Sequence, residues 1–223
     1  MRGRIAEVFD SIQGEGLYLG EKQIFVRFYG CNLECKFCDT KLKSFMEYEP
    51  DELFQELKLY QDSYHSVSFT GGEPLSQKDF LKEMLKLTRK DNFRNYLETN
   101  GVLHEELKEV IDYVDIVAMD LKLPSSTGLG DFWEEHRLFL KIASKREVFL
   151  KVVICSQSKE EDLKKALRLV RETAPEAVLV LQPDSSVDKV YLHDKLHTFK
   201  ELCKKERVTA CLVEQIHKVI GVR

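Results

Sequence analysis

The 223-residue sequence has no long apolar run and no excess of basic side chains. A membrane-spanning helix needs roughly 20 consecutive apolar residues, and the chain contains no such run. Residues 1–4 are not followed by the apolar core of a secretory signal. The formal net charge of −4 argues against a broad nucleic-acid-binding surface, which would show as an excess of Lys and Arg. We therefore expect a cytoplasmic protein that acts on a small molecule, without direct contact to nucleic acid or membrane.

Signs of a disulfide scaffold and of several domains are also missing. Six cysteines in a chain of 223 residues do not suggest a secreted, disulfide-rich domain. Cys155, Cys203 and Cys211 are scattered and flanked by apolar residues, which is typical of buried free thiols. The sequence contains no linker, low-complexity tract or internal repeat, and 43% of its residues are hydrophobic. We expect one domain that comprises residues 1–223.

The other three cysteines are close together. Cys31, Cys35 and Cys38 have the spacing Cys-x3-Cys-x2-Cys, directly after a strand-like run at 24–29 and Gly30. Thiolates from a short irregular loop can converge on one inorganic centre, and a four-iron cluster normally takes four of them. Three thiolates would leave one iron open to a small molecule. A zinc site with a fourth ligand from elsewhere and three unrelated thiols are the alternatives, although zinc ligands usually come as two separated pairs.

Strand and helix patterns alternate along the rest of the chain. Strands are expected at 4–12, 24–29, 66–70, 96–99, 116–119, 148–154, 177–181 and 208–213. Helices are expected at 51–60, 76–90, 104–112, 131–144, 158–172 and 194–206. Ser76 is expected to cap one of them, and Ser158 with Glu161 to form a capping box, whereas 123–128 is expected to be a loop. Such alternation predicts parallel strands with right-handed crossovers, in an open barrel or a doubly wound sheet.

Unusual residues gather where these strands end. The turns that follow the strands are the cysteine loop, 70–74, 98–101, 120–122 and 182–183, and sites form at the carboxyl ends of parallel strands. The glycines of the turn at 70–74 would let a ligand approach the backbone closely, although an ordinary turn is the alternative. Asp120 and Lys122 could contact a cofactor or form a simple ion pair. We expect one shared site at this edge of the sheet.

Charged residues also stand inside apolar strands. Arg27 lies in the run at 24–29, and Glu98 and Lys151 are likewise charged residues within their own strands. Burying an unpaired guanidinium is costly. Arg27 therefore either pairs with a protein carboxylate or binds an anionic substrate through bidentate hydrogen bonds of its guanidinium group.

The cysteine motif with Phe37 before its third thiol resembles the signature of the radical S-adenosylmethionine (SAM) superfamily. The resemblance implies a partial (β/α)6 barrel, open and mostly parallel. It also implies that Cys31, Cys35 and Cys38 hold a 4Fe–4S cluster whose fourth iron binds SAM, and that cluster and SAM generate a 5'-deoxyadenosyl radical. By the same resemblance, the residues that contact SAM are Phe37, Cys38, Asp39, Gly72, Asp120, Lys122 and Gln182.

Further segments resemble one family within this superfamily. The pieces at 11–16, 25–27, 30–33 and 38–40 are similar to the 7-carboxy-7-deazaguanine synthase family, and 70–74, 98–101, 124–126, 182–183 and 215–218 extend the similarity. The resemblance implies ring contraction of 6-carboxy-5,6,7,8-tetrahydropterin to 7-carboxy-7-deazaguanine with loss of ammonia, in queuosine-type tRNA modification. It also implies a homodimer and an external reductant such as flavodoxin.

The same resemblance assigns the substrate site. Arg27 would pair with the substrate carboxylate, and Gln13 and Glu15 would bind the amide and amino edge of the pterin. The remaining substrate contacts that it implies are Ile12, Gly14, Thr70 and His217. Thr40 would bind Mg²⁺, since a hydroxyl oxygen suits a hard cation, although a plain turn residue is the alternative.

The sequence departs from the family pattern in two places. Asp120-Leu121-Lys122 stands where Ser-Pro-Lys is common, and residues 46–49 replace a tyrosine-rich stretch. An activase of a glycyl-radical enzyme, which would act on a protein backbone, is therefore kept as an alternative. An iron–sulfur electron carrier or sensor is another, although a carrier usually ligates its cluster fully.

Overall fold

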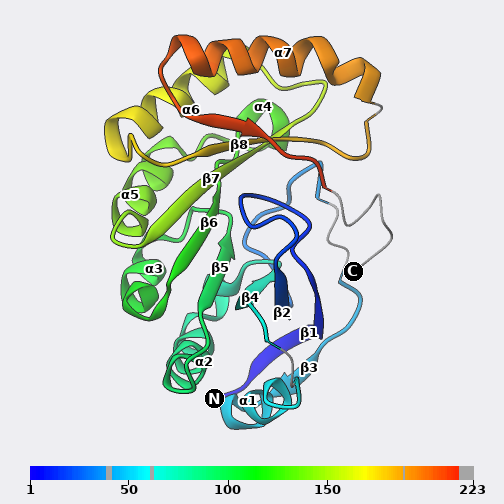
Figure 1. Ribbon diagram of the computed structural model, residues 1–223, viewed down its shortest axis with the longest axis vertical. Coiled ribbons are helices and arrows are strands. Elements are labelled where there is room, and N and C mark those ends of the chain that lie inside the picture. Colours follow the sequence, from blue (N-terminus) through cyan, green and yellow to red (C-terminus); the bar gives the residue numbers. More distant parts are fainter. Residues whose placement is uncertain (39–41, 61–62, 188, 216–223) are drawn as a thin grey trace.

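A single curved sheet organises the molecule. The computed structural model describes residues 1–38, 42–60, 63–187 and 189–215. Within them the sheet has nine strands in the order β3-β1-β2-β4-β5-β6-β7-β8-β9 (Figure 1). The strands are β1 Gly3–Ile12, β2 Lys22–Phe28, β3 Met46–Tyr48, β4 Ser66–Gly71, β5 Asn95–Thr99, β6 Ile116–Asp120, β7 Glu147–Ile154, β8 Leu179–Pro183 and β9 Ala210–Leu212.

Most of the sheet is parallel. β2 pairs with β4, and each later strand pairs in parallel with the next, up to β9. β1 is antiparallel to both β2 and β3. β3 and β9 are the two edges of the sheet and do not pair with each other. The expectation of an open, mostly parallel barrel is therefore confirmed.

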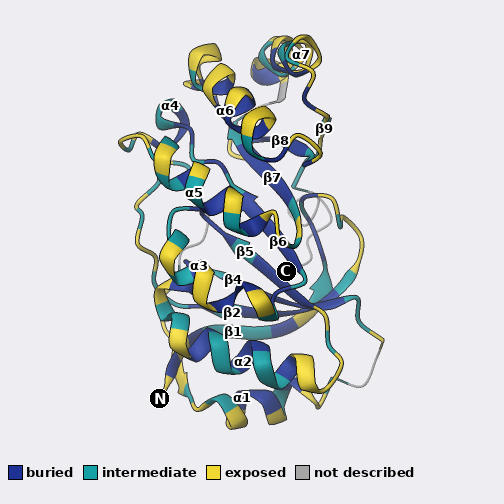
Figure 2. Cartoon of the chain, turned by 90° about the vertical axis from the view of Figure 1, so that its left-hand side faces the viewer, coloured by how far each residue is buried: buried dark blue, intermediate teal, exposed yellow. Residues whose placement is uncertain are grey.

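Helices cover one face of this sheet, as the crossovers between parallel strands require (Figure 1). The helices are α1 Pro50–Leu57, α2 Lys78–Lys90, α3 His104–Val110, α4 Pro124–Thr127, α5 Trp133–Ala143, α6 Glu160–Thr173 and α7 Lys189–Lys205, with 3₁₀ turns at Pro74–Gln77 and Ile111–Tyr113. α2 buries Phe80, Leu81, Met84 and Leu85, a spacing that puts one helical face against the strands. Figure 2 shows the opposite, exposed faces of the helices in yellow.

The central strands bury both of their faces, whereas the edge strands β3 and β9 do not. On β6, Val117 and Met119 belong to the large core beneath the helices. Ile116 and Ala118 instead point to the concave side, where they join a small cluster with Phe149. This alternation follows from the two-residue period of a strand. Among the described residues, no helix is long and apolar enough to cross a membrane.

The loop between β1 and β2 folds over the concave cluster. Gly16 has a positive φ of 68°, and a Cβ there would lie 2.7 Å from the Phe149 ring. The Gln13 N–H donates to the Glu21 carbonyl at 2.7 Å and closes the loop at its base. A glycine is needed for both the backbone angle and the close approach. The loop is therefore packed against the interior of the barrel.

Some local predictions were wrong. Ser76 lies inside the 3₁₀ turn, whose N-cap is Glu73. Lys159, not Ser158, precedes α6, because the Ser158 hydroxyl accepts the Cys155 N–H at 2.8 Å and stabilises the turn before the helix. Residues 124–127, expected in a loop, form the short helix α4. β3, which no periodic pattern announced, is held by pairing to β1.

Candidate active site

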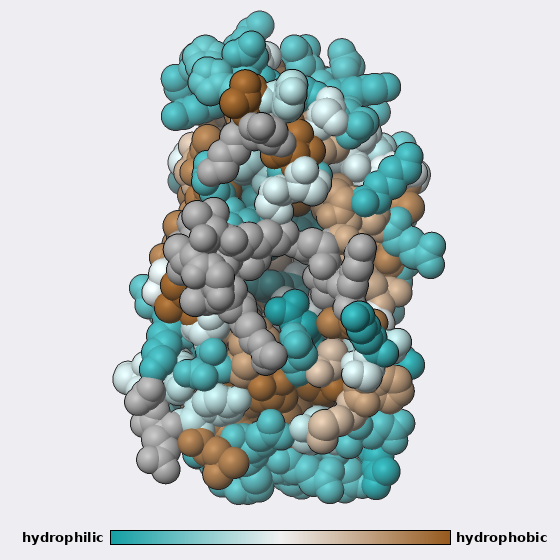
Figure 3. Space-filling view, turned by 90° about the vertical axis from the view of Figure 1, so that its right-hand side faces the viewer, coloured by the Kyte–Doolittle hydropathy of each residue, from teal (hydrophilic) through white to brown (hydrophobic). Residues whose placement is uncertain are grey.

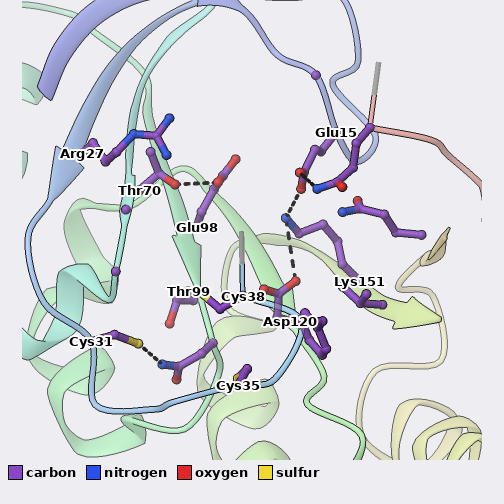
Figure 4. A pocket seen from close by; sticks show the side chains of 18 of the residues that line it. Glu15, Arg27, Cys31, Cys35, Cys38, Thr70, Glu98, Thr99, Asp120 and Lys151 are labelled. Carbon is purple, nitrogen blue, oxygen red and sulfur yellow. Dashed lines mark hydrogen bonds and ion pairs between the residues drawn. The ribbon is translucent and has the colours of Figure 1, made fainter. Parts of the chain in front are cut away.

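A cavity of about 400 Å³ opens at the carboxyl ends of the parallel strands. Figure 3 shows hydrophilic side chains in a hollow on this face of the molecule. The cysteine loop and the end of β4 lie at one side of the cavity, and the β1–β2 loop and β7 at the other (Figure 4). The predicted site residues that line it are Ile12, Gln13, Gly14, Glu15, Arg27, Cys31, Cys35, Phe37, Cys38, Thr70, Gly72, Asp120, Lys122 and Gln182. Asp39, Thr40 and His217 lie outside the described residues.

The cysteine loop is fixed by backbone contacts with the turn after β4. The Gly72 N–H donates to the Phe28 carbonyl at 3.0 Å, and the Glu73 N–H donates to the Gly30 carbonyl at 2.9 Å. A Cβ on Gly72 would lie only 1.9 Å from the Gly30 oxygen. Only glycine permits this approach. Gly72 therefore has a structural reason to be glycine, in addition to the SAM contact predicted for it.

The three thiols all reach the cavity. Cys31 and Cys38 are exposed, and Cys35 is half-buried. Burial raises the pKa of Cys31 and Cys35, and Lys122 acts in the opposite direction on both. Among the described residues, no three His, Cys, Asp or Glu side chains converge as the ligands of one metal ion would. A 4Fe–4S cluster is bound through separate irons, so three thiols spread along one wall fit a cluster.

Glu73 supports the cysteine loop from behind. It is fully buried, and its carboxylate accepts from the backbone N–H of Asn100 at 2.7 Å and of Leu75 at 3.1 Å. The Thr99 hydroxyl donates to it at 3.0 Å. Burial raises the pKa of Glu73 to about 7, although these hydrogen bonds act in the opposite direction. Glu73 thus joins the ends of β4 and β5 behind the thiols.

Asp120 and Lys122 form an ion pair at the wall of the cavity. The Lys122 Nζ lies 2.8 Å from the Asp120 Oδ2 and 5.4 Å from the centre of the Phe37 ring. Burial lowers the pKa of His136 to about 4, so its neutral ring accepts the backbone N–H of Lys122 at 3.0 Å. The ion pair between Asp120 and Lys122 is therefore present, and its lysine is held by its backbone. Both side chains nevertheless line the cavity, and their contact with a cofactor stays a prediction.

Glu98 is the centre of a hydrogen-bond network on the other side. Its carboxylate accepts from the Gln13 Nε2 at 2.8 Å and from the Thr70 hydroxyl at 2.7 Å. The Gln13 amide also donates to Gln23 at 3.0 Å and accepts the Glu15 N–H at 3.0 Å. The side chain of Gln13 is therefore engaged by the protein, and it shapes the loop that carries Glu15.

Glu15 is held by a buried lysine. The Lys151 Nζ lies 3.0 Å from the Glu15 Oε2 and 3.7 Å from the Asp120 Oδ1. The Gln215 amide donates to the other Glu15 oxygen. Burial raises the pKa of Glu15, but Lys151 and these hydrogen bonds outweigh it and lower the value to about 2. Glu15 is therefore an ionised acceptor at neutral pH.

Arg27 contacts a protein carboxylate and also lines the cavity, so its role toward a substrate stays a prediction. Its Nε lies 3.0 Å from the Glu7 Oε2, without the alignment of a hydrogen bond. Its guanidinium lies 5.4 Å from the centre of the Phe9 ring. Arg27 also lines the cavity beside Thr70, its partner in the β2–β4 register. The Glu7 contact leaves the guanidinium directed toward the cavity (Figure 4).

Several residues of the site were missed or left undecided by the sequence. Glu98 and Lys151 were noted as charges within apolar strands but were not assigned to the site, and that signal alone could have found them. Asn100 and Gln215 lie in the segments 98–101 and 215–218, which were noted but given no role for these two residues. No periodicity or motif announces the other additional lining residues, which include Glu7, Phe9, Asp184 and Ser185. They reach the cavity through strand pairing and loop packing.

Comparison with known proteins agrees with this geometry. Residues 25–193 match the radical SAM superfamily. A 7-carboxy-7-deazaguanine synthase of Geobacter sulfurreducens is 34% identical over 242 aligned positions, which cover 97% of this chain and 96% of the relative. A 7-carboxy-7-deazaguanine synthase of Methanopyrus kandleri is 33% identical, with 97% and 92% covered. The synthase of Aquifex aeolicus is 32% identical, with 97% and 93% covered.

Solved structures show the same fold. The crystal structure of QueE from Escherichia coli superposes with a TM-score of 0.66 at 21% identity, and the match covers 95% of this chain and 93% of that one. A structure of TYW1 with a lysine-pyruvate adduct superposes with a TM-score of 0.60 at 16% identity. With cysteine motif, barrel and near full-length relatives in agreement, the chain belongs to the radical SAM superfamily and, within it, to the 7-carboxy-7-deazaguanine synthase family.

Proposed function

We propose that this protein is a 7-carboxy-7-deazaguanine synthase, which contracts the ring of 6-carboxy-5,6,7,8-tetrahydropterin with loss of ammonia. One observation carries the proposal beyond family membership. A single cavity has three thiols at one side and ionised Glu15 with Arg27 at the other. A cluster bound by these thiols would lie within reach of groups that suit a carboxylated heterocycle. The substrate-side network favours this reaction over the activase, whose substrate is a protein backbone.

The cofactor side of the cavity would hold the cluster and SAM. Cys31, Cys35 and Cys38 supply the donor set for three irons. When bound, the 4Fe–4S cluster and SAM supply the radical that removes a hydrogen atom from the substrate. The cofactor contacts proposed for the chain are Phe37, Cys38, Asp39, Gly72, Asp120, Lys122 and Gln182. The Asp120–Lys122 pair is net neutral and so suits the amino and carboxylate groups of SAM, which together are also neutral.

The substrate side of the cavity would recognise the pterin through charge and hydrogen bonds. The Arg27 guanidinium would bind the substrate carboxylate, since its planar fork matches two oxygens. The Glu15 carboxylate would accept N–H groups from the amino-pyrimidinone edge. Gln13 fixes the Glu15 backbone at 3.0 Å and so orients this acceptor. We propose that Ile12, Gly14, Thr70 and His217 complete the substrate contacts.

Magnesium, partners and location belong to the same proposal. Thr40 would bind Mg²⁺ through its hydroxyl beside substrate oxygens, which is typical oxygen ligation for this cation. We propose that residues 1–223 act as one radical SAM core domain in a homodimer. An external reductant such as flavodoxin would supply electrons in the cytoplasm, and the product would enter queuosine-type tRNA modification without direct nucleic-acid contact.

Anaerobic turnover tests this function. The reconstituted, dithionite-reduced protein is incubated with SAM, Mg²⁺ and 6-carboxy-5,6,7,8-tetrahydropterin, and products are identified by mass spectrometry. Formation of 7-carboxy-7-deazaguanine is expected. If 5'-deoxyadenosine forms without that product, the radical chemistry stands and the proposed substrate is wrong. If SAM is not cleaved at all, the electron carrier or sensor becomes the better reading.

A further inference from the structure

Lys151 is a buried lysine in the middle of an apolar strand. It lies on β7 between Leu150 and Val152, which are fully buried, and its own exposed fraction is 5%. A buried ammonium is costly unless it is paired. Lys151 meets this requirement with two carboxylates, since its Nζ lies 3.0 Å from Glu15 and 3.7 Å from Asp120. The position of this lysine is therefore built around those two acidic partners.

The four charges form a row of alternating sign across the cavity. Glu15 stands on the substrate side, Lys151 and Asp120 follow, and Lys122 ends the row beside Phe37 (Figure 4). Two negative and two positive groups balance one another along the row. Removal of Lys151 would leave Glu15 without a counter-charge in a half-buried position.

The other groups around Glu15 cannot replace that cation. Gln215 and Gln182 contribute neutral amides. Asp120 lies on the other side of Lys151 from Glu15 and is negatively charged, so it cannot replace the cation. Tyr96 and Glu98 also face Lys151 from β5, and both are acidic. Among the described groups that act on Glu15, Lys151 is thus the one that carries positive charge.

Glu73 shows what burial does in the same fold where the described residues form no ion pair with the carboxylate, and Lys122 lowers its pKa only as a minor effect. Both glutamates accept several hydrogen bonds, but burial raises the pKa of Glu73 to about 7, whereas Lys151 helps to lower the pKa of Glu15 to about 2. A Glu15 that took up a proton would lose acceptor capacity and turn one oxygen into a donor. It would then no longer match a ligand edge made of N–H donors.

We propose that Lys151 is a positioning residue that holds Glu15 as an oriented, ionised acceptor for the N–H donors of the bound heterocycle. Through Glu15, Lys151 sets the selectivity for ligands that present such donors, and it need not touch the ligand itself. This inference rests on the proposed function for the identity of the ligand, but not for the ionisation of Glu15.

Pterin binding without turnover tests the proposal. The holoenzyme with SAM but no reductant is titrated with 6-carboxy-5,6,7,8-tetrahydropterin by anaerobic calorimetry at pH 6 to 8.5. Lys200→Met, at an exposed lysine, is the matched control. Subtracting its binding free energy from that of Lys151→Met at each pH removes the pH dependence of the pterin itself. Lys151→Met is expected to bind at least about tenfold more weakly at pH 6, because Glu15 without its cation takes up a proton and loses acceptor capacity. The loss should shrink as pH rises and Glu15 ionises.

A double-mutant cycle separates positioning from direct contact. In the Glu15→Gln background, Lys151→Met is expected to change the dissociation constant by less than about twofold and to add no pH dependence. Losses that add across the two positions would mean that Lys151 acts on the ligand independently of Glu15, which overturns the proposal. A constant loss at every pH in Lys151→Met would overturn it as well.

Urea unfolding of the ligand-free holoenzyme decides the question even if the pterin does not bind. Absence of pterin binding to the unsubstituted protein would count against the proposed function alone. The free energy of unfolding is compared between Lys151→Met and the double variant with Glu15→Gln. The single variant should become less stable than the double variant as pH rises above about 5, because Glu15 would ionise without its cation. If Lys151→Met does not fold, Glu15→Gln is expected to restore folding. No pH difference between the two proteins, or no restoration, contradicts the proposal.

Discussion

The two sides of the cavity are built on different principles. On the cofactor side, the cysteine loop is set by backbone contacts at Gly72 and Gly30 and by Glu73 behind them. On the substrate side, ionised side chains around Glu15 and Lys151 set the geometry. Glu73 is fully buried and Glu15 is half-buried; the pKa of Glu73 is raised to about 7 and that of Glu15 is lowered to about 2. Burial dominates at Glu73, whereas Lys151 and the hydrogen bonds together outweigh burial at Glu15.

This difference predicts different sensitivities. The cofactor side should respond to changes of shape, and the substrate side to changes of charge. Substitutions on the cofactor side should remove SAM chemistry altogether. Substitutions on the substrate side should weaken pterin binding and leave SAM binding nearly intact.

The largest effect is expected from loss of a thiol on the cofactor side. Cys35→Ala should abolish cluster loading, because two remaining thiolates cannot hold a cluster that already has only three. Iron and sulfide content and the cluster absorption band measure this. Cys211→Ala, at a half-buried cysteine away from the cavity, serves as the control and should load normally. Normal iron content in Cys35→Ala would remove its assignment as a ligand.

A single methyl group should be nearly as damaging on this side. Gly72→Ala would place a Cβ 1.9 Å from the Gly30 oxygen, so the cysteine loop must shift. We expect a loss of about 1–3 kcal/mol in the free energy of unfolding, with SAM cleavage strongly reduced. Gly130→Ala is matched, since nothing lies within 4 Å of its added Cβ. Equal behaviour of the two variants in urea unfolding and SAM cleavage would show that backbone contact does not set the loop.

On the substrate side, Arg27→Ala tests the importance of charge. Its removal should weaken the carboxylated pterin by about tenfold to a hundredfold, as expected for lost hydrogen bonds between charged groups. SAM affinity should change by less than about threefold. Calorimetric titration with each ligand separately measures both values. Equal losses for pterin and SAM would erase the distinction between the two sides.

The smallest effect concerns the ionisation of Glu73. Because its pKa in the folded state, about 7, exceeds the unfolded value, the folded protein binds the extra proton between about pH 4.5 and 7. Its contribution to stability is therefore complete below this window and is lost as pH rises through it, by up to about 1 kcal/mol per pH unit. Urea unfolding at matched iron content should show this decrease of the free energy of unfolding with pH. Glu73→Gln should be less stable overall, but its stability should not show this pH dependence. An unchanged slope in Glu73→Gln would mean that Glu73 is ionised throughout.

Sequence patterns predicted much of the fold and of the cofactor side. The strands from β4 to β8 carry long buried apolar runs, and the cysteine spacing identifies its loop without any tertiary information. The glycine turn after β4 was found for the same reason. Local signals sufficed because each of these features lies within a few consecutive residues.

The substrate side was harder to read because its contacts join distant parts of the chain. Glu98 bonds to Gln13, 85 positions away, and Lys151 to Glu15, 136 positions away. The apolar strand around Lys151 marks this lysine as unusual, but nothing local identifies Glu15 and Asp120 as its two partners. Capping was misread for a different reason, since Ser158 uses its hydroxyl in the preceding turn, three residues away.

The contact between Glu15 and Gln215 has a consequence for the order in which the protein is made. The two residues are 200 positions apart. During translation, the cysteine loop and the strands from β2 to β8 emerge before Gln215 does. A nascent chain can therefore assemble the wall that would bind the cluster while Glu15 still lacks one of its donors. A chain that ended before Gln215 would therefore still contain the cysteine loop but would lack one of the donors that fix Glu15.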